Sequence, residues 1–137
     1  MELLVIRHAQ AEDESLTGLD RDRALTKRGR RQARALGHNL AALQRTPDLV
    51  LSSPLVRARD TASLFCEAAG LGDPILENWL ACGMRPEEAM HELSGYRDFS
   101  RVALFGHQPD FGYLAEFLTG SAEGRIRVRK ASVMVFT

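Results

Sequence analysis

Residues 3–9 of the chain are LLVIRHA, an unbroken run of four apolar residues followed by an arginine, a histidine and an alanine. Such a run is typical of a strand that is buried on both faces, as strands of parallel sheets are. The two polar residues come at the point where such a strand leaves the core. We therefore expect a buried strand here, with Arg7 and His8 at its carboxyl end.

The same pattern recurs further along the chain. Short apolar runs at residues 48–51 and 102–105 also predict buried strands. Segments with apolar residues at helical spacing alternate with these strands, which predicts an α/β three-layer sandwich whose helices flank a mostly parallel central sheet. The other expected elements are a first helix capped by Thr26 and ended by Pro47, a helix reaching about Ala69 and closed by Gly70, helices at 86–93 and 111–118, a weak strand at 75–76, and strands at 126–128 and 133–136.

Length and composition indicate one domain over residues 1–137. With 45% hydrophobic and 26% charged residues, the chain can bury a core without a metal or a disulfide. Its 18 basic and 18 acidic residues balance, which argues against a dedicated nucleic-acid binder. No apolar run approaches the roughly 20 residues of a membrane span, and the first one is too short for a signal peptide. The two cysteines have neither metal-ligand nor disulfide-framework spacing, so we expect a cytoplasmic protein.

Polar residues follow three of the predicted strands. The first strand ends in Arg7 and His8, the second leads to Arg57, and the third is followed by His107. Because parallel strands place their carboxyl ends at one edge of the sheet, where open α/β folds bind ligands, these side chains should meet. Two arginines and two histidines in one place make an anion site. The commonest anion that needs such a clamp is a phosphoryl group.

Two basic stretches lie outside this group. Residues 27–34 hold five cations at positions consistent with the solvated side of an amphipathic helix. In residues 125–129 arginines alternate with apolar residues, as on a half-buried strand. Neither stretch contains the interleaved aromatic residues of a nucleic-acid surface, so we expect solvated faces without nucleic acid. Docking of an acidic partner protein is the alternative.

Four motifs together resemble one family. RHA at residues 7–9 is similar to the RHG or RHA signature of the histidine phosphatase superfamily, and SSPLVRARDTA at 52–62 resembles its SSPLxRAxxTA segment. GHQPD at 106–110 resembles its GHxP element, and LTKRGRRQA at 25–33 is a further family-like stretch. The motifs span nearly the whole chain in the family's order. The short length, without a lid insertion, is most similar to the SixA-type phosphohistidine phosphatase branch and implies a phosphoglycerate mutase-like fold.

The resemblance implies the roles of the clustered residues. His8 would be the nucleophile that takes the phosphoryl group and is regenerated by water, while Arg7, Arg57 and His107 would clamp the phosphoryl oxygens as positioned cations. Imidazole must be neutral to attack, and the two neighbouring arginines disfavour its charged form. The same resemblance implies a metal-independent reaction without a cofactor.

Other residues of these chemical types have less support. We expect His38 and His91 to be structural or exposed. Ser53 is interpreted as a turn or helix-cap residue rather than a substrate contact. Cys66 lies in an apolar helical context and should belong to the core, whereas Cys82 lies in a loop-like stretch with nothing nearby in sequence to activate it.

The general acid that protonates the leaving group is left open. Many superfamily members use a glutamate, and the candidates here are Glu12, Asp13, Glu77 and Glu87, with Glu77 nearest by position. An enzyme without this acid should favour substrates whose leaving group departs easily. The labile phosphoramidate bond of phosphohistidine meets that condition, and a site without a lid would suit a phosphorylated protein.

Three functions therefore remain open from the sequence. The first is a phosphatase acting through phospho-His8, on phosphohistidine in proteins. The second is a phosphatase of a small phosphorylated metabolite or nucleotide, and the third is a non-catalytic phosphate-binding module. A mutase is least favoured, since both a lid and an assigned acid are missing. The physiological substrate, the pathway and the oligomeric state are not determined by the sequence.

Overall fold

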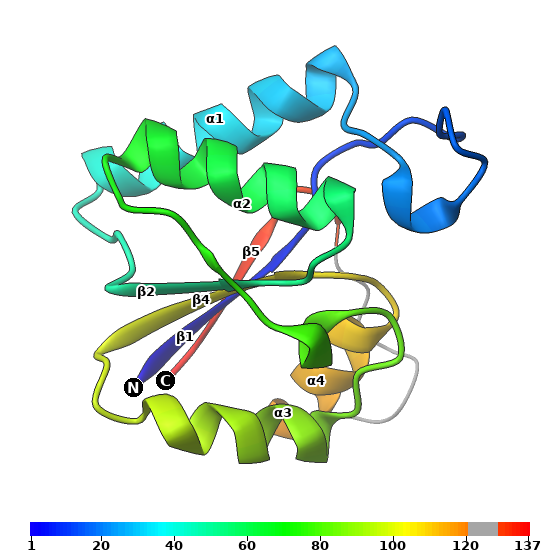
Figure 1. Cartoon of the computed structure of the whole chain (residues 1–137). Coiled ribbons are helices and arrows are strands. Elements are labelled where there is room, and N and C mark those ends of the chain that lie inside the picture. The colour runs from blue at the N-terminus through cyan, green and yellow to red at the C-terminus, as the bar shows by residue number, and fades with distance from the viewer. Residues whose placement is uncertain (121–128) are drawn as a thin grey trace.

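A central sheet organises the molecule (Figure 1). The computed structural model describes residues 1–120 and 129–137. Within this part the sheet has five strands in the order β3-β2-β4-β1-β5, all parallel except β5, which runs antiparallel to β1. The predicted α/β sandwich with a mostly parallel sheet is confirmed. The strands are β1 (Glu2–Arg7), β2 (Leu49–Ser52), β3 (Ile75–Leu76), β4 (Arg101–Gly106) and β5 (Val133–Phe136).

Helices cover both faces of the sheet. Figure 1 shows α1 and α2 above it and α3 and α4 below it. None of the helices in the described ranges is both long and apolar enough to cross a membrane. The helices are α1 (Lys27–Ala42), α2 (Val56–Ala69), α3 (Pro86–Leu93) and α4 (Asp110–Thr119), joined by the short 3-10 turns η1 (Asp20–Asp22), η2 (Asn78–Leu80) and η3 (Ser94–Tyr96).

The predicted start of α1 and the predicted glycine ends of two helices are confirmed, but the expectation that Pro47 ends the first helix is wrong. That helix ends at Ala42, because Gln44 takes a left-handed φ of 55° and the amide of Arg45 donates back to the carbonyl of Leu40 at 2.8 Å. The Thr26 side chain accepts a hydrogen bond from the Gly29 amide and caps α1. Gly70 and Gly120 end α2 and α4 with φ of 73° and 70°, in the left-handed region that glycine adopts without strain. The strand expected at residues 126–128 lies outside the described residues.

The continuous apolar run of β1 follows from its position inside the sheet, between β4 and β5. Leu3 and Val5 pack on the α3–α4 side, whereas Leu4 and Ile6 pack on the side of α2, against Phe65 among others. Each fully buried aliphatic side chain of this kind stabilises the fold by about 1.5–3 kcal/mol. Both faces of β1 are therefore core, as its sequence predicted.

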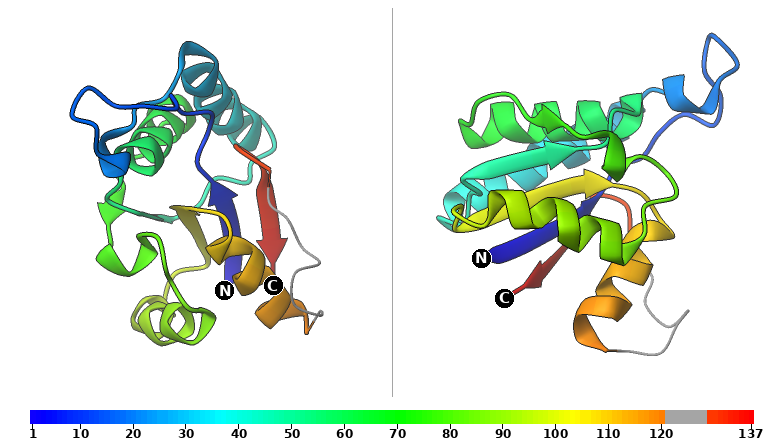
Figure 2. Two further views of the ribbon diagram at one scale, coloured as in Figure 1. Left: turned by 90° about the vertical axis from the view of Figure 1, so that its right-hand side faces the viewer. Right: turned by 60° about the horizontal axis from the view of Figure 1, so that its bottom comes forward.

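The parallel strands all end on one side of the molecule. Figure 2 shows the arrowheads of β2 and β4 pointing the same way, towards the loops that precede α2 and α4. The residues after β1 emerge at this same edge, because Arg7 pairs with Gly106 in the sheet register. The motifs singled out from the sequence therefore meet at the carboxyl edge of the sheet.

Candidate active site

Backbone hydrogen bonds tie the three strand ends together. The amide of His8 donates to the carbonyl of Gly106 at 3.0 Å, and the amide of Ser53 donates to the carbonyl of Phe105 at 2.9 Å. The end of β4 thus fixes the residues that follow β1 and β2. This arrangement brings the ring centroids of His8 and His107 to within 5.5 Å of each other.

His8 is a buried and neutral imidazole. Its side chain is almost enclosed, and burial, helped by the nearby charges of Arg57 and Arg7, lowers its pKa to about 4. The sequence argument identified the arginines, but burial is the larger cause. Nδ1 lies 2.7 Å from the carbonyl oxygen of Ala9, which can only accept, so Nδ1 carries the proton. The lone pair of the neutral ring is therefore on Nε2.

A threonine of α2 joins the loop after His8 to the first turn of that helix. The hydroxyl of Thr61 accepts a hydrogen bond from the amide of Ala9 at 3.0 Å and donates to the carbonyl of Arg57 at 2.6 Å. Thr61 is the threonine of the SSPLVRARDTA segment, and it is completely buried. One side chain thereby fixes the backbone next to both His8 and Arg57.

The motif at residues 25–33 holds the next residue of the same loop. The amide of Gln10 donates to the side chain of Gln32 at 3.0 Å, and its carbonyl accepts from the amide of Thr26 at 3.0 Å. Gly29 leaves room for this contact, because a Cβ at that position would lie 2.0 Å from the carbonyl oxygen of Gln10. The family-like stretch on α1 is therefore a support for the loop that follows His8.

Arg57 lies in the first turn of α2, and its side chain is 4% exposed. Its Nη1 donates to the carbonyl of Asp20 at 3.1 Å, and its Nη2 donates to the Asp20 carboxylate at 3.2 Å and to Sγ of Cys82 at 3.7 Å. The Nε of Arg57 is buried and has no hydrogen-bond partner among the described residues. The guanidinium is thus held at one edge and has an unsatisfied donor at the other.

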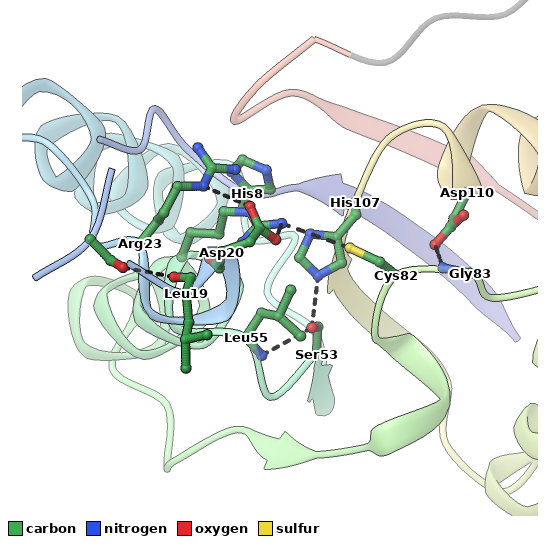
Figure 3. Close-up of polar contacts among 12 residues, drawn as sticks. His8, Leu19, Asp20, Arg23, Ser53, Leu55, Cys82, Gly83, His107 and Asp110 are labelled. Carbon is green, nitrogen blue, oxygen red and sulfur yellow. Dashed lines mark hydrogen bonds and ion pairs between the residues drawn. The ribbon is translucent and has the colours of Figure 1, made fainter. Parts of the chain in front are cut away.

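Asp20, on η1, is the carboxylate that contacts this basic group (Figure 3). Burial alone would raise its pKa, but a hydrogen bond from Arg23 and the charge of Arg57 outweigh burial and hold that pKa below its ordinary value. Asp20 is therefore ionised at neutral pH. Nothing in the local sequence distinguishes it from the other acids of the same segment.

His107 follows β4 and is 2% exposed. Its Nε2 lies 2.8 Å from the hydroxyl of Ser53, which also accepts from the amide of Leu55 at 3.2 Å (Figure 3). The glycine before it is required, because a Cβ on Gly106 would lie 2.6 Å from the ring of Phe111. The turn role expected of Ser53 is present, and its contact with His107 is an addition that the sequence did not indicate.

The expectation that His107 supplies a positive charge needs correction. Burial, together with the charges of Arg57 and of His8, lowers the pKa of His107 to about 3. The ring therefore enters the site neutral, and its Nδ1 is buried without a partner among the described residues. The positive charge comes from Arg57 and Arg7. Burial and the charge of Arg57 lower the pKa of Arg7 from its ordinary value.

The remaining histidines and the two cysteines lie in different environments. His38 on α1 and His91 on α3 are exposed, as expected. Cys66 is buried in the core, also as expected. Cys82 is exposed as a loop residue, but it contacts Arg57, so the sequence-based interpretation missed its place at the site.

The candidate general acids have separate surroundings. Glu77 accepts a hydrogen bond from the hydroxyl of Tyr96, which occupies one of its carboxylate oxygens. Glu12 and Asp13 are exposed in the segment before η1, and Glu87 is exposed near the start of α3. The structure thus gives the four candidates different settings without assigning the acid to one of them.

The described residues contain no group of three or more His, Cys, Asp or Glu side chains arranged to hold a metal ion. What the site does contain, within the described part of the chain, is a buried donor without a partner, Nε of Arg57, close to the charged side chain of Arg7. Buried donors without partners are rare in folded proteins and need an explanation. An anion that accepts from them is the simplest one.

The comparisons with known proteins agree with this chemistry. Residues 3–92 match the family model of the histidine phosphatase superfamily (branch 1). The chain therefore belongs to the histidine phosphatase superfamily. An uncharacterized protein of Picosynechococcus is 30% identical over 98% of this chain and 83% of its own length.

Solved structures extend the likeness to the whole fold. The protein histidine phosphatase SixA, solved with tungstate, superposes with a TM-score of 0.88 at 21% identity, over 100% of this chain and 88% of SixA. The alpha-ribazole phosphatase of Shigella flexneri superposes with a TM-score of 0.76 at 23% identity, over 98% of this chain and 89% of that enzyme. The predicted phosphoglycerate mutase-like, SixA-type architecture is confirmed.

Proposed function

We propose that this protein is a metal-independent phosphatase whose catalytic residues are Arg7, His8, Arg57 and His107. The observation that carries the proposal is a buried, neutral His8 beside two buried nitrogens, Nε of Arg57 and Nδ1 of His107, that have no hydrogen-bond partner among the described residues. A neutral imidazole is a nucleophile, and positioned donors stabilise the charge that spreads over phosphoryl oxygens in the transition state. The two features complement each other only if a phosphoryl group binds between them.

The hydrogen bonds of His107 prepare it to bind an oxygen. The hydroxyl of Ser53 accepts from the amide of Leu55, and Nε2 of His107 is its other hydrogen-bond partner among the described residues, so we infer that it donates its own proton to Nε2. The proton of the neutral ring is then on Nδ1, which has no other partner among the described residues. His107 thus offers an N–H to a phosphoryl oxygen, while Arg7 and Arg57 supply positive charge.

The reaction then proceeds in two displacements. In the first, Nε2 of His8 forms a bond to phosphorus, and the bond from phosphorus to the leaving group breaks. In the second, water attacks the same phosphorus, the bond from phosphorus to Nε2 breaks and returns its electron pair to His8, and the proton of the water leaves with the phosphate or passes to solvent. The carbonyl of Ala9 keeps its hydrogen bond to Nδ1 throughout, which holds the ring and stabilises the positive charge that it gains.

For the substrate, we propose phosphohistidine in a protein. The P–N bond of phosphohistidine breaks easily, so release of the substrate imidazole makes the least demand on a general acid. The likeness to a protein histidine phosphatase supports this choice. A small phosphorylated metabolite or nucleotide is the second candidate, which the likeness to alpha-ribazole phosphatase supports. Comparing kcat/KM on a phosphohistidine protein and on a panel of phosphorylated metabolites separates the two.

Hydrolysis of an aryl phosphate in excess chelator tests the proposed activity. Wild-type turnover should survive the chelator, and His8→Ala should reduce kcat by on the order of 10⁴-fold or more, as removal of other catalytic nucleophiles does. His38→Ala, which changes an exposed histidine of α1, is the matched control and should keep the wild-type rate. Unchanged turnover in His8→Ala would contradict the mechanism. A wild type that binds phosphate without turnover would instead favour a non-catalytic module.

A further inference from the structure

The two edges of the Arg57 guanidinium have different partners. Nη1 and Nη2 form one edge, and both donate to Asp20, at 3.1 Å to its carbonyl and 3.2 Å to its carboxylate. Nε and the remaining N–H of Nη2 form the other edge. There Nε is buried without a partner among the described residues, and Nη2 meets only Sγ of Cys82 at 3.7 Å.

The second edge is therefore the one available to an oxyanion. Two parallel N–H groups bind two oxygens of a phosphoryl group in a planar, bidentate contact, which is the geometry that arginine provides best. A thiol is a weak hydrogen-bond acceptor, so the contact with Cys82 does not satisfy this edge. The sulfur of Cys82 consequently stands where a phosphoryl oxygen would approach Nη2.

Cys82 also faces solvent. It is exposed, in the loop between η2 and α3, whereas Arg57 beneath it is 4% exposed. Figure 3 shows the side chain of Cys82 with its sulfur at the end of a dashed line, which is the contact with Arg57. A group attached to this sulfur would thus be reached from solvent and would lie over the edge of Arg57 that carries the unpartnered Nε.

We propose that Cys82 is a covalent modification site that closes the phosphoryl-binding edge of Arg57 when it forms a mixed disulfide with a small thiol such as glutathione. The Cys82 thiol loses its proton to solvent, and the thiolate attacks one sulfur of oxidised glutathione. A bond forms between Sγ and that sulfur, the disulfide bond of the reagent breaks, and the released glutathione thiolate takes up a proton. Cys82 is oxidised and the departing glutathione is reduced. The loss of activity rests on the proposed function, whereas the modification itself does not.

The other cysteine provides an internal comparison. Cys66 is 2% exposed, and burial raises the pKa of its thiol to about 11. The pKa of the Cys82 thiol is also raised, by burial first and by Asp110 and Asp20, although Arg57 opposes the shift. The charge of Arg57 also attracts an anionic reagent. Selectivity for Cys82 therefore follows from its exposure and from the cation beside it.

The test measures glutathione bound per chain by intact mass, and aryl phosphate hydrolysis, after incubation with oxidised glutathione. Wild type and Cys66→Ala should each gain one glutathione, mapped to Cys82 by peptide analysis. Each should lose activity by about tenfold or more, because the adduct displaces substrate from its productive position. Dithiothreitol should restore the rate. Cys82→Ser should gain no adduct and keep the rate of its own untreated sample.

Inorganic phosphate gives a second readout that does not depend on turnover. Phosphate bound at Arg57 should slow modification of Cys82 in the wild type. Inactivation of Cys82→Ser to the same extent as wild type would overturn the proposal, as would a Cys82 adduct that leaves the wild-type rate unchanged. If the wild type hydrolyses no phosphate ester, the proposed function fails. Protection by phosphate then decides the placement of Cys82 alone, and an absence of protection overturns it.

Discussion

The two ends of the sheet carry similar residues in opposite states. At the amino end, Arg101 of β4 pairs with Glu2 of β1, and the Asp48 carboxylate accepts from the amides of Ser100 and Arg101 at 2.9 and 2.8 Å. At the carboxyl end, Nε of Arg57 is buried without a partner in the described part of the chain. The groups named at the amino end are satisfied by one another, whereas Arg57 keeps a buried N–H without a partner in the described part of the chain although its other edge pairs with Asp20.

This difference separates a structural role from a functional one. Ion pairs near the surface contribute modestly to stability, and their paired groups need no further ligand. Buried donors without partners cost free energy of folding, so a fold that keeps them gains something else. At the carboxyl end that gain is the capacity to bind an anion beside a neutral His8.

Replacing arginine by lysine at the two ends should give the sharpest contrast. Arg57→Lys should lower kcat/KM for an aryl phosphate by about 10²–10³-fold, because an ammonium cannot reproduce the planar pair of N–H donors. Arg101→Lys should leave kcat/KM unchanged and lower the free energy of unfolding by at most about 1 kcal/mol. Steady-state kinetics and urea unfolding of both variants measure these effects. Equal losses of activity at the two ends would remove the distinction.

A smaller effect is expected from Ser53→Ala. The change leaves Nε2 of His107 without its partner, which frees the ring to adopt the other tautomer. Loss of a buried hydrogen bond costs about 1–3 kcal/mol, and we expect kcat to fall by about tenfold to a hundredfold. Ser94→Ala, which removes an exposed hydroxyl bonded to the carbonyl of His91, is the control and should leave kcat unchanged. A Ser53→Ala enzyme with wild-type kcat would show that His107 needs no orientation.

The smallest effect is expected from a change of pH near neutrality, where the activity should stay constant. Protonation of Nε2 would remove the lone pair of His8, and burial lowers the pKa of that ring to about 4. The value of kcat/KM should therefore stay level as the pH falls from neutral and decline only near pH 4, provided that the protein remains folded. A pH–rate profile, with circular dichroism at each pH, measures this. A decline centred on 6.5, the value of an ordinary histidine, would mean that the ring is not buried in solution.

His8 and His107 also make the free energy of unfolding depend on pH. Their pKa values of about 4 and about 3 in the folded chain lie below the unfolded value of 6.5. As the pH falls below 6.5, the unfolded chain binds protons that the folded chain does not. The stability that the two neutral rings contribute is therefore fully present above pH 6.5 and is lost progressively between 6.5 and about 3. Thermal unfolding should accordingly show a lower Tm at pH 5 than at pH 7, with His8→Ala reducing the difference.

The sequence was sufficient for the fold and for the four central residues, because both depend on local patterns. Apolar runs identified β1, β2 and β4, and the parallel order of such strands placed Arg7, His8, Arg57 and His107 at one edge. In the structure the ring centroids of His8 and His107 lie 5.5 Å apart, and the charges of Arg7 and Arg57 are near enough to lower the pKa of both rings. The catalytic roles of these residues remain predictions.

The rest depends on contacts between distant segments. Arg57 meets Asp20 across 37 positions and Cys82 across 25, and Thr61 meets Ala9 across 52. No local pattern marks these pairs. The low pKa of His8 was attributed to the arginines, because charges can be counted in a sequence, whereas burial, the larger cause, exists only once the chain has folded.

The central claim is that the phosphoryl group is transferred first to His8 and then to water. Trapping phosphorylated His8 tests this claim most directly. The protein is mixed with an aryl phosphate, quenched within the first turnover under alkaline denaturing conditions that preserve phosphohistidine, digested and mapped by mass spectrometry. We expect the phosphoryl group on the peptide that contains His8, and its absence from His8→Ala. Turnover without a phosphoryl group on His8, or with one on another residue, would contradict the account.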